Sequence, residues 1–216
     1  LEANAAAGED KVIRLAGGTL FYAESAGLQI ENLHIQGNEI DCTLNISGSM
    51  NNWKGDLIGK NIRAERVQAL YESFAQVLDT SKQQQTSPQP TRVTLKVQID
   101  RLYYRRAKFD NANATIEFEP QGIHIRDIKA TPYTGAVEGQ AEIKPPEGGI
   151  PRRVYLDLRV VDADARAIDE LAFLEPRQLT GTVSGSVTVA FPVGENVVPI
   201  NATSGMVEFT ARNGSY

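Results

Sequence analysis

The stretch Val93-Thr94-Leu95-Lys96-Val97-Gln98-Ile99-Asp100 alternates apolar and polar side chains without a break. Successive side chains of a β-strand point to opposite faces, so this period of two predicts a strand with one apolar and one solvated face. The same period occurs over residues 40–46 and again over residues 154–160. The alternation therefore predicts a mainly β protein.

Short alternating segments follow one another from Lys11 onward and are separated by Gly, Asn-Gly or Pro. This spacing predicts roughly ten to twelve strands. Two segments instead have the period of an amphipathic helix, residues 65–78 and about 165–174. We expect a large, curved, mostly antiparallel sheet of repeated strand units with two short α-helices, shaped either as a groove or as a sandwich.

The chain divides into four parts by composition. Residues 1–10 have the character of a tag, a linker or a disordered start, and residues 11–80 form a first β unit that ends in a helix. Residues 81–91 are rich in Gln, Ser and Pro and are expected to be a flexible linker. Residues 92–216 form a second β unit that includes the short helix 165–174. We expect the chain to be a fragment of a longer protein.

Two segments share one strand-to-helix design. Residues 56–65 and residues 156–164 each end in an acidic residue, Glu65 or Asp164, just before a helical segment. An acidic side chain favours a helix N-terminus by capping and by charge, and Asp162 and Asp164 are explained in this way rather than as calcium ligands. A match about a hundred residues apart indicates a repeated unit.

Composition narrows the classes of function. The 216 residues carry a net charge of -5 with both signs interspersed, which disfavours nucleic acid as a partner. Cys42 is the only cysteine, so an internal disulfide is excluded, and its place on the apolar side of residues 40–46 predicts a core thiol. No apolar run has the roughly 20 residues needed to cross a bilayer.

The sequence offers little for catalysis or metal binding. The two histidines, His34 and His124, each lie on the polar side of a strand, with no second His or Cys near them in sequence. A metal site or a nucleophilic triad would need a convergence of ligands or bases that is not visible, and no phosphate-binding loop occurs. We expect no catalytic residue, no metal and no cofactor, and hence a protein that is not an enzyme.

One cluster interleaves cations with tyrosines, over residues 101–108. Arginine binds phosphate through two hydrogen bonds, and aromatic rings favour membrane interfaces, so the cluster could hold anionic lipid headgroups. The candidates are Arg101, Tyr104, Arg105, Arg106 and Lys108. The alternative is a solvated hairpin turn with long side chains lying along the surface.

The second half contains a strand-helix-strand run over residues 156–189, with Leu179-Thr180-Gly181-Thr182-Val183-Ser184-Gly185 within it, and a closing run from Gly205 to Gly214. These segments resemble the AsmA-like family of bacterial envelope proteins. The resemblance covers residues 93–216 and, more loosely, residues 11–78. It implies a periplasmic body, an inner-membrane anchor outside this chain and a role in outer-membrane lipid homeostasis. Larger relatives resemble long β-grooves that carry phospholipid between membranes.

The apolar face of such a sheet must be covered, because several hundred Å² of exposed apolar surface is either a liability or a binding site. One hypothesis is a groove that binds phospholipid or another envelope lipid. Its candidate lining residues, each equally a candidate core residue, are Ile99, Ile116, Phe118, Leu158, Val187 and Phe209. The alternative is a closed core in a module that scaffolds an envelope assembly with protein partners. Small residues within 137–143 also indicate the close approach of another group.

Overall fold

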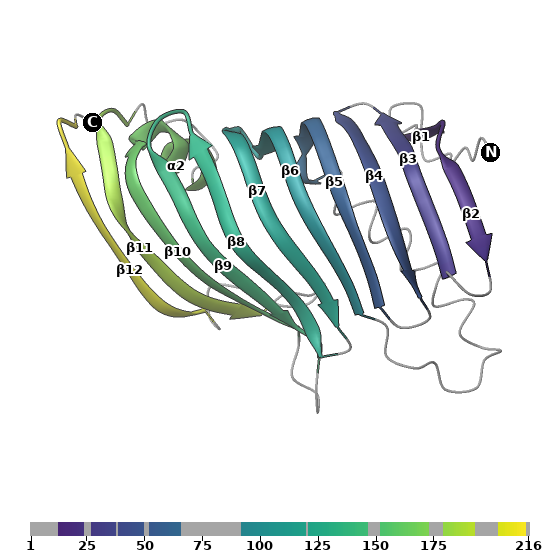
Figure 1. Ribbon diagram of the computed structural model, residues 1–216. Coiled ribbons are helices and arrows are strands. Elements are labelled where there is room, and N and C mark those ends of the chain that lie inside the picture. Colours follow the sequence, from purple (N-terminus) through teal and green to yellow (C-terminus); the bar gives the residue numbers. More distant parts are fainter. Residues whose placement is uncertain are drawn as a thin grey trace.

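The computed structural model describes residues 13–23, 27–37, 39–49, 52–65, 92–119, 121–146, 152–172, 179–192 and 203–214. Twelve strands in this part of the chain form one β-sheet. The strands stand side by side in a single layer, from β2 at one side to β12 at the other (Figure 1). The predicted mainly β, mostly antiparallel fold is confirmed.

The bounds of the elements follow the alternating segments closely. The first half contains β1 (Ile13–Ala16), β2 (Thr19–Ala23), β3 (Gly27–Gly37), β4 (Ile40–Ser49) and β5 (Asn52–Arg63). The second half contains β6 (Arg92–Tyr104), β7 (Ala107–Glu119), β8 (Gly122–Pro132), β9 (Ala136–Lys144), β10 (Arg153–Asp164), α2 (Ala165–Ala172), β11 (Thr182–Pro192) and β12 (Ser204–Arg212).

Each strand from β3 to β12 lies beside its neighbours in sequence, and β1 and β2 both pair with β3. The strand pairs are antiparallel except for β5 and β6, which run parallel from the pair Asn52 and Arg92 to the pair Arg63 and Tyr103. The two β units expected from composition therefore meet at this parallel pair and share one sheet.

The helix expected at residues 165–174 is observed as α2, Ala165–Ala172. Asp164 caps it, since its Oδ1 accepts a hydrogen bond of 2.9 Å from the backbone N–H of Arg166. Of the first expected helix, residues 65–78, the structure describes Glu65, which is helical together with the preceding Ala64. Residues 66–78, the linker at 81–91 and residues 1–10 lie outside the described residues, so those expectations stay untested.

Besides the bulge at Lys60 between β4 and β5, four β-bulges interrupt the pairing of the described strands, and each of these four contains an Asn or Asp in the left-handed region. These residues are Asn32, Asn111, Asp127 and Asp162, with φ between 46° and 54°. At each position the bulged strand has one residue more than its partner, as between Ile30 and Leu33 of β3. The extra residue returns the following apolar side chains to the same face, because a shift of one residue would otherwise send them to the opposite face.

Few side chains of this sheet are buried. Among the described residues nine hydrophobic residues are buried, and five of these are alanines. Three of the other four, Ile40, Cys42 and Ile62, form one cluster, against which Ile35, Leu57, Ile99 and Leu102 pack. The predicted core position of Cys42 is confirmed, and burial, helped by the charge of Asp41, raises the pKa of its thiol to about 11. A single-layer sheet leaves most other apolar side chains half-buried.

Candidate functional site

The apolar face of the sheet is continuous from one side to the other. Residues that are direct cross-strand partners lie on the same face, so the strand register traces rows across it. One row crosses ten strands, β3 to β12, without a polar side chain: Ile30, Ile46, Gly55, Leu95, Ile116, Ile125, Ala141, Leu156, Val189 and Gly205. At about 4.8 Å between strands this row is about 43 Å long.

A second apolar row runs beside the first on the same face. It crosses seven strands, β5 to β11: Trp53, Val93, Phe118, Ile123, Ile143, Val154 and Phe191. Two adjacent rows free of polar side chains form a surface that water hydrates poorly. We call the surface made by these two rows and their neighbours the apolar face.

All six predicted lining residues lie on the apolar face. Ile116 and Phe118 belong to the two rows, and Leu158 and Val187 are direct cross-strand partners. Phe209, on the terminal strand β12, is 43% exposed. Ile99 differs from the rest, because it packs against the buried cluster of Ile40, Cys42 and Ile62. It therefore has the core role that the sequence analysis gave as the alternative for each of the six residues.

Several glycines on the apolar face are covered by a large neighbouring side chain. A Cβ added at Gly139 would lie 2.8 Å from Cδ2 of Leu158, and one added at Gly59 would lie 2.5 Å from Cδ1 of Ile62. The group that the small residues of 137–143 were expected to accommodate is therefore Leu158 of the next strand. The large side chain fills the space that the glycine leaves, so the face stays closely packed along the sheet.

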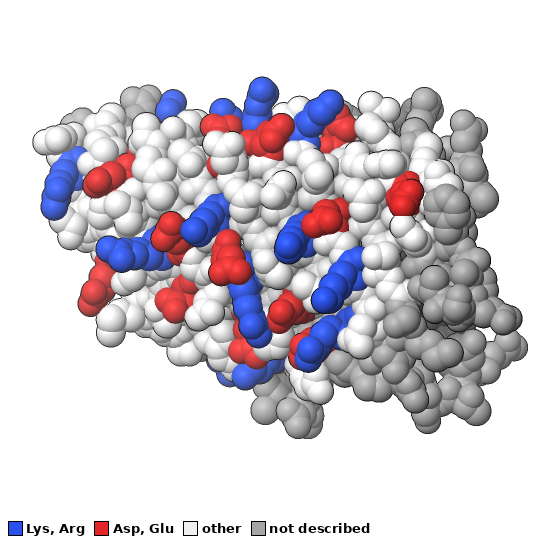
Figure 2. Space-filling model, in the orientation of Figure 1, with Lys and Arg blue, Asp and Glu red and all other residues white. Residues whose placement is uncertain are grey.

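The opposite face is charged, with Lys and Arg side chains interspersed among Asp and Glu (Figure 2). Cross-strand ion pairs include Arg126 with Glu117 at 3.2 Å and Arg92 with Glu119 at 2.7 Å. His34 lies 3.0 Å from Asp41, and His124 lies 3.8 Å from Glu142. Both histidines are thus on the polar face, as predicted.

A shallow hollow of about 610 Å³ lies on this polar face over β8 to β12. Its walls are two rows of mostly polar side chains on either side of the backbone of the first apolar row. They include His124, Glu142, Tyr155 and Ser204 in one row and Arg126, Gln140, Asp157 and Thr188 in the other. It is a furrow between side-chain rows and does not open onto the apolar face.

The basic cluster forms the hairpin turn between β6 and β7, as its alternative interpretation predicted. Arg105 lies at the turn with φ 54°, and its Nη1 donates a hydrogen bond of 2.7 Å to the carbonyl oxygen of Leu171 in α2. Its backbone carbonyl accepts one of 2.8 Å from Arg63. Lys108 forms an ion pair of 2.9 Å with Asp110. Arg105 and Lys108 therefore have partners within the protein, whereas a headgroup role for the cluster stays a prediction.

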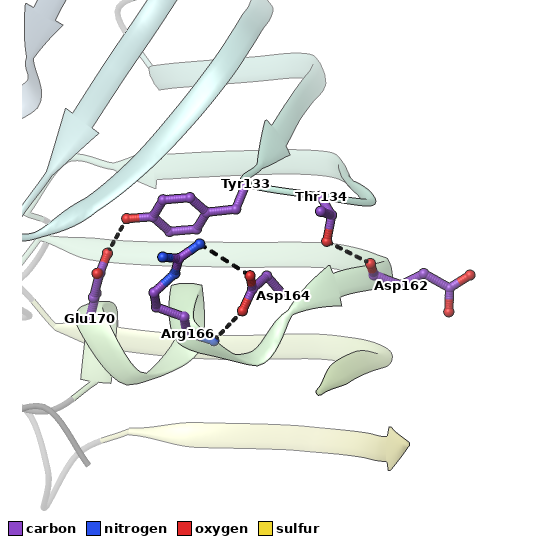
Figure 3. Close-up of polar contacts among 6 residues, drawn as sticks. All are labelled: Tyr133, Thr134, Asp162, Asp164, Arg166 and Glu170. Carbon is purple, nitrogen blue, oxygen red and sulfur yellow. Dashed lines mark hydrogen bonds and ion pairs between the residues drawn. The ribbon is translucent and has the colours of Figure 1, made fainter. Parts of the chain in front are cut away.

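A network of polar side chains fixes α2 to the turn between β8 and β9 (Figure 3). The guanidinium of Arg166 stacks 4.0 Å from the ring centroid of Tyr133 and lies 3.2 Å from Oδ2 of Asp164. The hydroxyl of Tyr133 donates to Oε2 of Glu170. Burial, together with the hydrogen bond to Glu170 and its charge, raises the pKa of Tyr133 to about 12.

Sequence reasoning missed Tyr133, and it assigned the wrong role to Asp162. Asp162 is the bulge residue of β10: its N–H donates to Oγ of Ser184 at 2.9 Å, and its carbonyl accepts a hydrogen bond from the Thr134 hydroxyl at 3.4 Å. It stabilises the bulge, and only Asp164 caps the helix. Arg166 and Glu170 are four residues apart and therefore share one face of the helix. This spacing in the sequence was the pattern from which the network could have been predicted.

The helix lies on the apolar side of the sheet. In Figure 1 α2 is behind the upper ends of the strands, and Figure 2 shows the charged face toward the viewer in the same orientation. It contacts β7 and β10. Of the apolar face, α2 thus covers a small part at one end.

The described residues contain neither a cluster of metal ligands nor a helix that could cross a membrane. No three His, Cys, Asp or Glu side chains of that part of the chain gather as a metal site. No helix in it is both long enough and apolar enough to span a bilayer.

No protein-family model, curated protein or solved structure matches this chain. The AsmA-like resemblance therefore rests on the residues quoted above.

Proposed function

We propose that this chain is a periplasmic, non-enzymatic part of an AsmA-like envelope protein whose apolar face binds phospholipid or another envelope lipid. The observation that carries the proposal is the ten-strand row without a polar side chain. The parent protein would be anchored in the inner membrane by a segment outside this chain, and the role would be in outer-membrane biogenesis or lipid transport.

The dimensions of the apolar face suit acyl chains. The row is about 43 Å long at strand spacing, which exceeds the ~30 Å of a bilayer hydrocarbon core that two opposed lipids fill. Each methylene group that leaves water on such a surface contributes about 0.8 kcal/mol. An acyl chain laid across several strands would therefore gain free energy along its whole length without any directional contact.

The charged end of the lipid would lie at the β6–β7 hairpin. Arg101 and Tyr104 are exposed there, and the same hairpin carries Arg106. Arginine and an aromatic side chain together suit a phosphate at the border between apolar and aqueous surroundings. Arg105 and Lys108 contribute less to this proposal, because both have partners within the protein.

The second candidate function is a scaffold with a closed core and no ligand, which binds other envelope proteins. The cluster of Ile40, Cys42 and Ile62 favours it, since that part of the face is packed on by Ile35, Leu57, Ile99 and Leu102. A scaffold of this kind would need no lipid to fold or to bind its partners.

The test combines native mass spectrometry of the purified chain with extraction and identification of bound lipid. Uptake of a fluorescent phospholipid from phosphatidylethanolamine–phosphatidylglycerol vesicles gives a second readout. Phe118→Asp and Phe209→Asp place a charge on the apolar face. Thr115→Asp and Thr210→Asp are the matched controls, because each places the same charge on the other face of the same strand.

Near-stoichiometric lipid that is lost in the two Phe variants and kept in the two Thr variants would support the proposal, provided that circular dichroism shows all four folded. A lipid-free mass together with no uptake from vesicles would contradict it and would favour the scaffold. Equal loss in the Phe and Thr variants would also contradict it, because the effect would then not depend on the apolar face.

A further inference from the structure

The apolar face is packed at one end of the strands and not at the other. β10 runs from Arg153 to Asp164 and continues directly into α2, so α2 marks one end of the strands, the upper one in Figure 1. All nine buried hydrophobic residues of the described part of the chain lie in α2 or in the half of the sheet nearer to it. We call the opposite ends of the strands β5 to β11 the lower end.

Both rows without polar side chains lie near the lower end. In each of the seven strands β5 to β11 the second row takes the residue next to the lower strand end, and the first row takes the residue two positions further in. No residue of either row is buried. Three members of the second row are aromatic, namely Trp53, Phe118 and Phe191. Trp and Phe are typical of the apolar side of protein segments that lie in a membrane interface.

The lower end is positively charged, although the chain as a whole is acidic. Beyond the second row, the described residues carry four basic side chains and one acidic one, a net charge of +3 on a chain of net charge -5. The basic residues are Arg92, Lys144, Arg152 and Arg153, and the acidic one is Glu119. Glu119 forms an ion pair of 2.7 Å with Arg92, which leaves three cations in excess. Lys144 lies 3.7 Å from Glu142 of the adjacent row, and 51% of its side chain is exposed.

We propose that the lower end of the sheet lies on the surface of an anionic lipid bilayer, with its apolar face toward the acyl chains and its basic side chains among the headgroups. Arg92, Lys144 and Arg153 each adjoin a residue of the second row in sequence, so they lie on the polar face of the same strand ends. Interfacial amphipathic helices have the same arrangement, because their apolar face enters the boundary between headgroups and acyl chains while Lys and Arg of the polar face stay in water.

This contact would orient the chain for the lipid binding proposed above, but it does not depend on that binding. The β6–β7 hairpin lies at the upper end of the same strands. A lipid whose headgroup is held there would point its acyl chains toward the bilayer, as it does in the leaflet that it leaves. The contact itself needs only the lower end, and it would form even if the apolar face retained no lipid.

The experiment is co-sedimentation of the 216-residue chain with sucrose-loaded vesicles of phosphatidylglycerol and phosphatidylethanolamine, compared with vesicles of phosphatidylcholine alone. Trp53 is the only tryptophan, so its emission reports on the lower end directly. We expect the chain to pellet with the anionic vesicles, to be released by salt, and to have its Trp53 emission quenched by phospholipids with brominated acyl chains.

Single charge removals locate the contact on the sheet. Lys144→Gln and Arg152→Gln are each expected to weaken binding to the anionic vesicles about fivefold, the effect of one basic residue at an anionic membrane surface. Arg159→Gln is the matched control, because it removes the same charge from the middle of β10. It lies about 20 Å from Arg153 along the strand, beyond the ~10 Å screening length of about 0.1 M salt, and is expected to bind like the wild type. Circular dichroism shows whether each variant is folded.

A wild-type chain that stays in the supernatant would overturn the proposal. If that chain carried vesicle lipid with it, the lipid binding proposed above would stand while the bilayer contact failed. Sedimentation without quenching of Trp53 would overturn the proposal as well, because the chain would then bind through another surface. Equal losses in Lys144→Gln and Arg159→Gln would do the same, since binding would not depend on the lower end. A chain that pellets with quenched Trp53 and is free of lipid after release by salt would support the bilayer contact and contradict the lipid binding.

Discussion

The ring of Phe209 on β12 lies against Gly185, its cross-strand partner on β11. A Cβ added at Gly185 would lie 2.6 Å from Cδ1 of Phe209 and would also collide with the carbonyl oxygen of Glu208. The pair therefore joins the last strand to the sheet through a contact that only glycine permits. The aromatic ring in turn covers the backbone that the glycine leaves exposed.

Replacement of Gly185 by alanine is expected to destabilise the protein. The clash involves the backbone of β12, which can move only by weakening its pairing with β11. Overpacking of this kind costs about 1–3 kcal/mol. Urea unfolding followed by circular dichroism measures the change, with Ser186→Ala on the exposed face of the same strand as the control. Equal unfolding midpoints for the two variants would contradict the role given to Gly185.

The thiol of Cys42 is expected to be inert in the folded protein. Burial raises its pKa to about 11 from 9.0, so the thiolate fraction near pH 8 falls about 100-fold, and the residue is buried as well. Ellman's reagent should react slowly with the native chain at pH 8 and rapidly in urea. Fast reaction of the native chain would show that the cluster around Cys42 opens readily.

The face of nearly every strand was predictable from the sequence, because the alternation of residues such as 93–100 and 40–46 has one physical meaning in a sheet. The register of the strand pairs was harder to predict from the sequence. Four of the bulges occur where the alternation changes phase at Asn32, Asn111, Asp127 or Asp162, and this change of phase was the signal that was missed. Asn and Asp tolerate the left-handed region, so these positions had both the pattern and the chemistry of a bulge.

The candidate site could be predicted less well. The six lining residues share one face, as their alternation required, but the sequence could not tell that Ile99 belongs to a packed cluster while Phe209 lies at an exposed edge. That difference depends on which strands become neighbours. The partners of Arg105 were hidden for the same reason, because Leu171 and Arg63 come from distant parts of the chain.

Tyr133→Phe is expected to lower stability at neutral pH and to change its dependence on alkaline pH. The variant loses the hydrogen bond to Glu170, which is worth about 0.5–1.5 kcal/mol. The folded pKa of about 12 lies above the ordinary 10.0, so the neutral phenol stabilises the fold fully below pH 10, and this contribution is lost as the pH rises toward 12.

The urea midpoints of wild type and Tyr133→Phe should therefore differ at pH 8 and converge by about pH 12. Every other titratable group is present in both proteins, so its contribution cancels in the comparison. A constant difference over this range would contradict the contribution assigned to the phenol.

Arg105 and Arg101 separate the structural role of the hairpin from its proposed headgroup role. Arg105→Gln removes the donor to the carbonyl oxygen of Leu171 and is expected to cost about 0.5–1.5 kcal/mol in unfolding free energy. Arg101→Gln lies on the exposed side of β6 and is expected to leave stability within about 0.5 kcal/mol of wild type, yet to weaken binding to anionic vesicles. Urea unfolding and vesicle co-sedimentation measure the two effects. If Arg101→Gln binds vesicles as well as the wild type does, Arg101 is not part of the headgroup site. If Arg105→Gln unfolds with the same free energy as the wild type, the contact of Arg105 with α2 does not hold the helix.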